Sequence, residues 1–418
     1  MEFSKKEMKA LQGVAILFML ALHLFARKEV NGLYETFPIF NGVPLVYYIG
    51  LFGDACVPIY LFAGGYGLFI SLGGEKNSKL KKNLIRILKL LINAWIILLL
   101  FIGIAFFVGR QEAFSGGTVE FFLNCFLLSN SYNGAWWYLQ TYTILVLLAP
   151  TLIRLVKRYN SFNLLIISGI IYLVSYVQRI KHVIDLGDNT ALILLVNATV
   201  LIGTSQLSFI VGFIFAKEKV YSKLYNKFHN IRFKNLLCGL GILMLVILHA
   251  LYESMVIAPL TAITFICFFK LMDKRDWIQN ILTFLGNHST NIWLTHMFFY
   301  ISIFPELIFA PKYPILIFVW LLTVCLISSF VINAIHHPII KIIDRKNHSS
   351  NKRYNTADVH GGTISGNSIY TNIEARGIDS KDGGVGAPPY KIEDNSLVNA
   401  KLFLTTTDSN TNHKESVN

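Results

Sequence analysis

Apolar runs of about 20 residues recur along most of this chain, and they constrain its fold more than any other feature. A helix needs about 20 apolar residues to cross the roughly 30 Å hydrocarbon layer of a bilayer. Of the 418 residues, 54% are hydrophobic and 15% are charged, a balance typical of polytopic membrane proteins. The fold class is therefore predicted to be an all-α polytopic membrane protein. The pattern predicts about ten transmembrane helices, near residues 10–27, 46–72, 87–108, 134–153, 162–177, 191–216, 236–252, 255–272, 281–304 and 314–340.

The basic residues predict the orientation of these helices. If the N-terminus is cytoplasmic and ten helices alternate in direction, 24 of the lysines and arginines within residues 1–346 fall inside and 6 fall outside. This bias follows the positive-inside rule, so the net charge of +13 reflects topology and no nucleic-acid partner is expected. Both termini are then predicted to be cytoplasmic. The protein is predicted to lie in the plasma (bacterial inner) membrane, in contact with its lipids. The first helix resembles a signal peptide without an A-x-A-like cleavage site, which predicts an uncleaved helix.

Two segments outside the ten predicted helices, and the spacing of the cysteines, carry further predictions. Residues 118–128 are apolar but short, which favours a re-entrant or interfacial helix. Residues 347–418 are rich in Asn, Ser, Thr and Gly and predict a disordered polar tail after a membrane domain at 1–346. The cysteines are scattered singly, so neither a disulfide framework nor a metal site is predicted: Cys56, Cys125, Cys238, Cys267 and Cys325.

Three ionisable side chains are predicted to lie within the bilayer. A charge there costs about 2 kcal/mol or more, so such residues usually face protein or water and mark function. His23 is about 20 Å deep at 1.5 Å per residue, and His296 lies at a similar depth in the ninth helix, which runs in the same direction. Asp54 enters the second helix near that level. Two histidines and a carboxylate at one depth would suit general acid–base chemistry.

A structural role for these three residues stays open, because each can simply satisfy a hydrogen bond between helices. Three further histidines are predicted at helix ends, which is typical of interfacial positions: His249, His336 and His337.

Two other segments stand out. The run from Cys56 to Gly67, CVPIYLFAGGYG, combines Pro58 with closely spaced glycines, which predicts either a kinked, tightly packed helix or a wall of a substrate tunnel. Arg86 and Lys89, with Lys81 and Lys82, gather at the cytoplasmic end of the third helix. Such a basic cluster suits either the phosphates of a cytoplasmic ligand or anionic lipids.

Five short segments carry a further signal through their sequence and the order in which they follow one another. They are LQGVAILFMLALH ending at His23, VPIYLFAGGYGLF from Val57, Arg86 with Lys89, Trp137-Tyr138-Leu139, and LGNHSTNIWLTH ending at His296. Together they resemble the motifs of the acyltransferase-3 family of integral membrane O-acyltransferases, and they span most of residues 9–340. Two positions depart from the family pattern. Gln12 stands where the family usually has arginine, and Gly64 replaces the usual serine. Trp136 and Trp137 also fit an aromatic belt at the outer face.

The resemblance implies transfer of an acyl group, commonly acetyl from acetyl-CoA, onto a hydroxyl of an extracytoplasmic glycan or lipid-linked sugar. Acyl-CoA is then a donor substrate, and no bound cofactor or metal is implied. His23 matches the essential histidine and would act as general base on the hydroxyl or carry the acyl group. The other implied site residues would bind donor or acceptor, orient His23 or stabilise the oxyanion: Gln12, Asp54, Arg86, Lys89, Trp137, Asn287, Ser289 and His296.

Two other classes of protein remain open at this stage. A proton-coupled transporter or flippase would use His23, His296 and Asp54 as a relay. A non-catalytic sensor or scaffold would need none of them for turnover.

Overall fold

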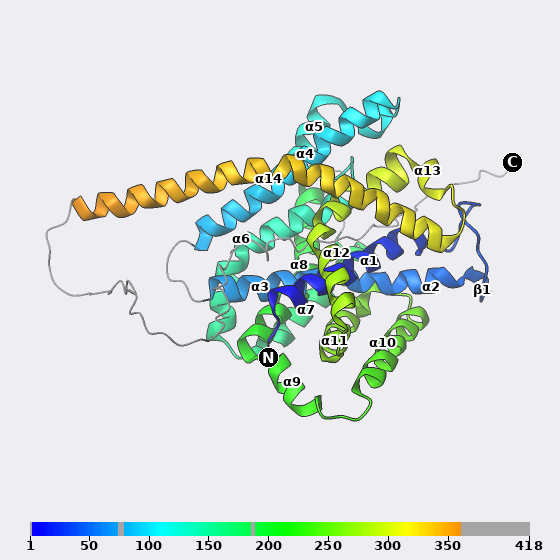
Figure 1. Ribbon diagram of the computed structural model, residues 1–418, viewed down its shortest axis with the longest axis horizontal. Helices are drawn as coiled ribbons and strands as arrows, with labels where there is room; N and C mark the ends of the chain where they lie inside the picture. The colour runs from blue at the N-terminus through cyan, green and yellow to red at the C-terminus, as the bar shows by residue number, and fades with distance from the viewer. Residues whose placement is uncertain (1, 74–78, 185–188, 361–418) are drawn as a thin grey trace, which may run out of the picture.

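The computed structural model describes residues 2–73, 79–184 and 189–360 (Figure 1). Within them the chain is a bundle of helices with one short β-hairpin. In chain order the elements are α1 (Lys5–Phe25), β1 (Ile39–Phe40), β2 (Val43–Pro44), α2 (Leu45–Leu51), η1 (Phe52–Ala55), α3 (Cys56–Leu72), α4 (Lys79–Phe107), η2 (Gln111–Phe114), α5 (Gly117–Cys125), η3 (Gly134–Trp136) and α6 (Trp137–Arg158). They continue as α7 (Ser161–Lys181), α8 (Thr190–Glu218), α9 (Val220–Phe228), α10 (Lys234–Leu251), η4 (Met255–Ile257), α11 (Ala258–Leu271), α12 (Asp276–Met297), η5 (Phe298–Ile303), α13 (Pro305–Phe309) and α14 (Pro314–His360).

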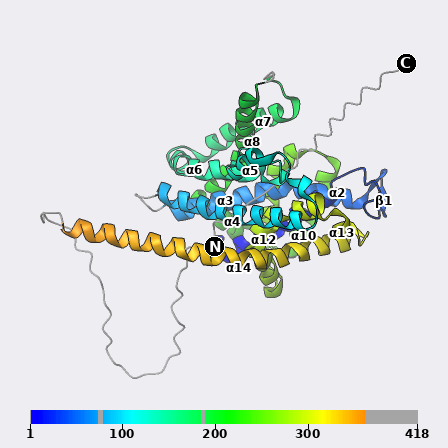
Figure 2. The same cartoon turned by 90° about the horizontal axis from the view of Figure 1, so that it is seen from above.

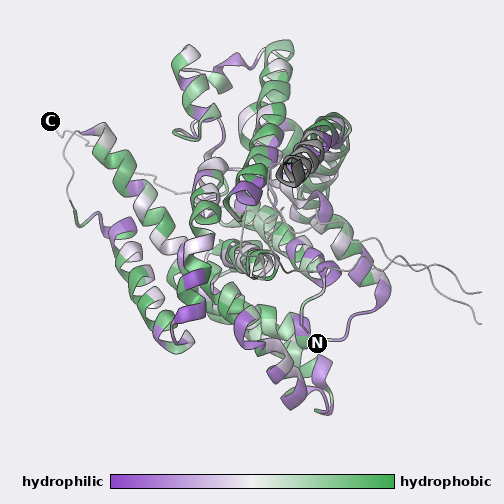
Figure 3. Ribbon diagram, turned by 90° about the vertical axis from the view of Figure 1, so that its left-hand side faces the viewer, coloured by the Kyte–Doolittle hydropathy of each residue, from purple (hydrophilic) through white to green (hydrophobic). Residues whose placement is uncertain are grey.

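The all-α polytopic class is confirmed. Among the described residues, eight helices are long and apolar enough to cross a membrane: Lys5–Phe25, Leu45–Leu72, Leu80–Phe107, Gly134–Arg158, Ser161–Lys181, Leu192–Glu218, Lys234–Leu251 and Pro314–Arg345. Green apolar residues accordingly cover most of the bundle in Figure 3. Each of the eight overlaps one predicted helix.

The other two predicted helices differ from the eight. The apolar helix at Met255–Leu271 is shorter, and the prediction at 281–304 falls on α12 and on η5, a π-helical turn. α12 carries histidines, amides and hydroxyls that a hydropathy criterion penalises, yet most of them are buried inside the bundle. The count of ten transmembrane helices and the sides of the termini therefore stay predictions.

Two further predicted segments have a clear outcome. The segment at 118–128 forms the nine-residue helix α5, far short of a membrane crossing. α14 continues to His360 and so passes the predicted start of the polar tail, while residues 361–418 lie outside the described residues (Figure 2).

α1 lies in the middle of the bundle and packs along α12. The two glycines at their crossing bring backbone against backbone: a Cβ on Gly13 would lie 1.9 Å from the Leu282 carbonyl oxygen. A Cβ on Gly286 would lie 1.9 Å from the Lys9 carbonyl oxygen. Lys6, further toward the start of α1, accepts at its carbonyl from Gln279 near the start of α12. The two helices therefore run parallel, with Gly13 level with Gly286.

α3 packs against α8 through another close approach. A Cβ on Gly65 would meet the Phe209 carbonyl oxygen at 2.1 Å, so this glycine of the predicted glycine-rich run fits tight packing. The predicted kink at Pro58 has a different form. Pro58 occupies the first turn of α3, where a missing N–H costs little, and the 3₁₀ turn η1 interrupts the helix just before it.

The helices divide into an inner and an outer set. Within its most apolar stretch, α1 is 78% buried and the Leu45–Leu72 segment is 83% buried, whereas α7 and α10 are each 11% buried. The last two expose leucines, isoleucines and valines that would face lipid. Polar side chains on α1, α3 and α12 are therefore enclosed by protein.

We expect Gly13→Ala and Gly286→Ala each to lower the thermal unfolding midpoint, because a methyl group there meets a backbone carbonyl that no rotamer can move. Overpacking of this kind costs about 1–3 kcal/mol. The measurement is tryptophan fluorescence during heating of the purified protein in detergent.

The matched controls are Gly103→Ala and Gly239→Ala, since a Cβ at either position meets nothing within 4 Å. These should hold or slightly raise the midpoint, because alanine favours helix over glycine by about 1 kcal/mol. Equal midpoints for Gly286→Ala and Gly239→Ala would contradict the close α1–α12 contact.

Candidate active site

Two histidines meet where α1 and α12 run side by side. The ring centroids of His23 and His296 are 4.9 Å apart, with the rings tilted by 48°. Both side chains are buried, at 5% and 0% exposure. Each histidine lies ten residues after its crossing glycine, so the parallel packing of the helices carries both rings to one level. The sequence prediction that they share one depth agrees with this placement, while their catalytic role stays a prediction.

The hydrogen bond of His296 fixes which of its nitrogens carries a proton. Its Nδ1 lies 2.7 Å from the Trp293 carbonyl oxygen, which can only accept. Nδ1–H is therefore the donor, and Nε2 of the neutral ring carries the lone pair. His296 is thus set as a base or hydrogen-bond acceptor at Nε2.

A tyrosine completes this cluster. The Tyr300 ring stacks on His296 with centroids 5.8 Å apart and lies 6.3 Å from the His23 ring. It belongs to η5, the π-helical turn that follows α12. π-Helical turns are frequent at functional sites because the wider turn re-aims side chains. Here the turn leaves Tyr300 buried beside both histidines.

The predicted meeting of Asp54 with this histidine pair is wrong. Its carboxylate Oδ2 lies 3.4 Å from Nε2 of His249 on α10, and both side chains are buried. His249 lies in the last turn of α10, at the predicted helix end, and its side chain is 0% exposed. The cause is the direction of the side chain around its helix axis: Gly53, one residue earlier, faces α1, and Asp54 is turned away from it toward α10.

A layer of buried polar atoms lies next to the histidine pair, toward the first halves of α1 and α12. Tyr60 donates its hydroxyl proton to the Gln12 carbonyl oxygen at 2.8 Å, and Tyr138 packs on Trp293 with ring centroids 6.1 Å apart. Within the described part of the chain, three atoms here are buried without a hydrogen-bond partner: Gln12 Oε1, Asn93 Oδ1 and Tyr138 Oη. Buried polar atoms are normally satisfied, so a group of three indicates a place for a polar guest or water.

The two predicted polar residues of α12 have different surroundings. Ser289 is 1% exposed and donates to the Gly286 carbonyl oxygen at 2.9 Å. Asn287 is exposed, unlike its neighbours Gly286 and His288, and its predicted role stays a prediction. Asn291, which the sequence prediction missed, accepts from Asn93 at 2.7 Å and donates to Asn333 at 2.9 Å. It therefore joins α4, α12 and α14.

Two residues of the predicted basic cluster, Arg86 and Lys89, contact polar partners near the start of α4. Arg86 donates to Ser71 at 3.0 Å and to Asn83 at 3.1 Å, and Lys89 forms an ion pair with Asp344 at 2.8 Å. These contacts tie α4 to α3 and to α14. They fix the direction of the guanidinium group, which matters for a bidentate contact with phosphate.

The two tryptophans at the start of α6 are buried and do not form the predicted belt. Trp136 is 3% exposed and donates its indole N–H to the Leu294 carbonyl oxygen at 3.2 Å. Trp137 is 8% exposed, and the guanidinium of Arg179 lies 5.6 Å from its ring. Asn133 donates to the same Leu294 carbonyl at 3.1 Å, so the start of α6 is anchored beside the histidine-bearing turn of α12.

One carboxylate links the segments that follow α1 and α10 to α2. Glu253, between α10 and η4, forms an ion pair with Lys28 at 2.6 Å and accepts from Tyr47 at 2.8 Å. The hydrogen bond from Lys28 lowers the pKa of Glu253 below the ordinary glutamate value, so the contact persists into mild acid.

These observations define a polytopic α-helical membrane protein with a histidine pair enclosed at the centre of its bundle. A family model described as "Acyltransferase domain" matches residues 5–334, and the chain belongs to this acyltransferase-3 family. The protein is therefore a multi-pass membrane acyltransferase. Comparisons with curated proteins and with solved structures found no match.

We expect Asn291→Leu to destabilise the protein, because it leaves Asn93 and Asn333 without their shared amide partner. Hydrogen bonds between helices in membranes are worth about 0.6–2 kcal/mol. Asn287→Leu on the same helix should have little effect, since that side chain is exposed. Unfolding midpoints of the two variants in one detergent provide the comparison, and a larger loss for Asn287→Leu would contradict the placement.

Proposed function

We propose that the protein transfers an acyl group, namely acetyl, from cytoplasmic acyl-CoA to a hydroxyl of a cell-surface or lipid-linked glycan. The observation that supports this most directly is the pair of adjoining histidine rings, which are buried together next to a layer of buried polar atoms. An imidazole can take the proton of an alcohol, which needs this help because an unassisted hydroxyl is a poor nucleophile at pH 7.

The donor would bind at the cytoplasmic end of α4. Arg86, held by Ser71 and Asn83, and Lys89 present positive charge there for the phosphates of the donor. Along α4, Arg86 and Phe101 are about 22 Å apart at 1.5 Å per residue, and Phe101 stacks on Phe298 at 4.7 Å, two residues after His296. The long, thin arm that carries the acyl thioester can span this distance. The unpartnered atoms of Gln12, Asn93 and Tyr138 would supply polar contacts on the way.

Each atom of the transfer has a destination. The acceptor hydroxyl gives its proton to an imidazole nitrogen of the pair, and its oxygen attacks the thioester carbonyl carbon. The C–S bond then breaks, and the leaving thiolate takes the proton from the imidazolium. With centroids 4.9 Å apart, the two rings disfavour double protonation, so the pair carries one proton at a time. Ser289 would help to orient the groups around the histidine pair without touching the reacting atoms. In an alternative form of this scheme, His23 itself accepts the acyl group and then passes it to the hydroxyl.

We expect His23→Ala to reduce O-acetyl content of surface glycans by about 100-fold or more, the scale of lost acid–base catalysis. The measurement is proton NMR of glycans from cells that lack the protein and are complemented at matched membrane levels. His296→Ala should cause a loss of similar order if the pair acts as a unit. His229→Ala is the control, because His229 is exposed at the end of α9.

Equal acetylation by wild type and His23→Ala would contradict the catalytic role of His23. The transporter alternative predicts pH-driven substrate movement without covalent change. It relied on Asp54 as a third relay group beside the histidine pair, and the hydrogen bond of Asp54 to His249 removes that arrangement.

A further inference from the structure

Arg27 lies just after the end of α1, next to the histidine pair, and within the described residues its charge has no carboxylate partner. Its side chain is partly exposed and donates one N–H to the His23 carbonyl oxygen at 3.3 Å. The carboxylates of the same loop, Glu29 and Glu35, are exposed and form no ion pair with it in the described chain. A guanidinium has about five N–H donors in a planar fork, so most of the hydrogen-bonding capacity of Arg27 is unused.

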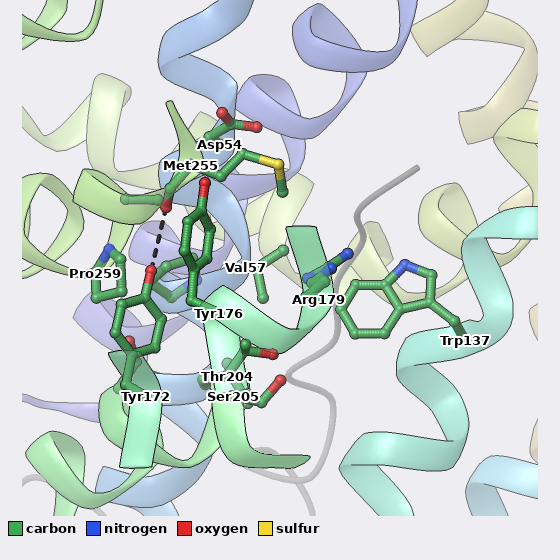
Figure 4. A pocket seen from close by; sticks show the side chains of 14 residues that line it. Asp54, Val57, Trp137, Tyr172, Tyr176, Arg179, Thr204, Ser205, Met255 and Pro259 are labelled. Atoms are coloured by element: carbon green, nitrogen blue, oxygen red, sulfur yellow. Dashed lines mark hydrogen bonds between the residues drawn. The ribbon is translucent and has the colours of Figure 1, made fainter. Parts of the chain in front are cut away.

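Other cations of the bundle are compensated, which sets this arginine apart. The adjacent Lys28 forms an ion pair with Glu253 at 2.6 Å. Arg179 lies 5.6 Å from the ring of Trp137 and close enough to Asp54 to act on its charge. These last three residues line the pocket shown in Figure 4. A cation without such a partner indicates a place for an anion from outside the chain.

A tyrosine in the loop after α1 adds a second unsatisfied group. Tyr34 is 4% exposed, and its hydroxyl is buried without a hydrogen-bond partner within the described residues. Its ring packs edge-on against Phe25, the last residue of α1, with centroids 5.4 Å apart. Burial raises the pKa of Tyr34 above the ordinary tyrosine value, and the charge of Arg27 opposes this shift only in part. The hydroxyl therefore keeps its proton at neutral pH and can donate it to a ligand.

The two groups lie beside the histidine pair. Arg27 is close enough to act on the charges of Tyr34, Tyr300 and His23, so these side chains form one group. Tyr300 in turn stacks on His296. An anion bound by Arg27 and Tyr34 is therefore held next to both histidine rings. The predicted orientation places this end of α1 on the extracytoplasmic side, from which the proposed acceptor would arrive.

The bond from Arg27 to His23 also has a structural explanation. The backbone N–H of Arg27 bonds to Phe25, so the His23 carbonyl lacks its partner from the next turn. Arginines near a helix C-terminus commonly bond such carbonyls. This capping role accounts for one N–H of Arg27, but it accounts neither for the missing carboxylate nor for the buried hydroxyl of Tyr34. A cation beside a neutral donor matches a phosphate or carboxylate, because the guanidinium fork can bond two of its oxygens.

We propose that Arg27 and Tyr34 bind an anionic group of the acyl acceptor, a phosphate or a carboxylate, and so hold the acceptor hydroxyl beside the histidine pair. The proposal rests on the proposed acyl transfer and adds a charge requirement that acyl transfer itself does not need. Arg27 bonds two oxygens of the anion, and Tyr34 donates to one of them. Neither residue takes part in the proton transfers.

The experiment measures the binding of three sugars that differ in charge, without any acyl donor. Purified protein in nanodiscs of zwitterionic lipid is titrated with glucose 6-phosphate, glucuronate and methyl glucoside, and bound sugar is detected by saturation-transfer NMR. We expect at least one charged sugar to bind about tenfold more tightly than methyl glucoside, the scale of one added hydrogen bond to a charged group. A preference for only one of the charged sugars identifies the anion as phosphate or as carboxylate.

The variants assign this preference to the two residues. Arg27→Gln should abolish it, and Tyr34→Phe should weaken binding of the charged sugar about fivefold, the scale of one neutral hydrogen bond. Lys28→Gln is the matched control, because it removes one positive charge from the adjacent exposed residue and should keep the preference. Tyr34→Phe keeps the ring that packs on Phe25, so it decides the matter if Arg27→Gln does not fold.

Equal binding of all three sugars by wild type, or unchanged binding of the charged sugar in both Arg27→Gln and Tyr34→Phe, would overturn the assignment. Loss of the preference in Lys28→Gln would overturn it too, since this would indicate a general effect of surface charge. The outcome is separable from the proposed function. Glycan acetylation that depends on His23, without a charge preference here, would overturn this assignment alone. A charge preference without any such acetylation would overturn the acyl transfer, and with it the role of the anion in holding an acceptor.

Discussion

The contact of two helix backbones at Gly13 and Gly286 is the constraint on which the candidate site depends. α1 and α12 can approach this closely only because neither residue has a side chain, and the polar residues of α12 are buried as a result. In a bilayer there is no hydrophobic force between helices, so such close packing and hydrogen bonds hold them together. The bond between Asn93 and Asn291 adds α4 to the same unit.

The sequence predicted what depends on length and depth. The positions of the apolar helices follow from hydropathy, and the common level of His23 and His296 follows from counting residues along two helices of the same direction. The family motifs predicted the membership that the match over residues 5–334 shows.

What the sequence could not provide is direction around each helix axis. Consecutive residues differ by about 100° in an α-helix, so a residue at the correct depth can face any neighbour. Asp54 therefore faces α10 instead of the histidine pair, whereas Gly53 just before it faces α1. Tyr300 was missed for another reason, since it depends on a π-helical turn that no propensity signals.

The shared ten-residue spacing from glycine to histidine on α1 and α12 limits where insertions and deletions can occur in this chain. One residue inserted between Gly13 and His23 would rotate the His23 imidazole by about 100° around the helix axis and shift it by about 1.5 Å along that axis, although neither histidine is itself substituted. A matching insertion in α12 would rotate the partner ring in its own helix and would not restore their facing sides. The ten-residue interval is therefore fixed in each helix separately, and variation in length is tolerated only before the glycines or beyond the histidines.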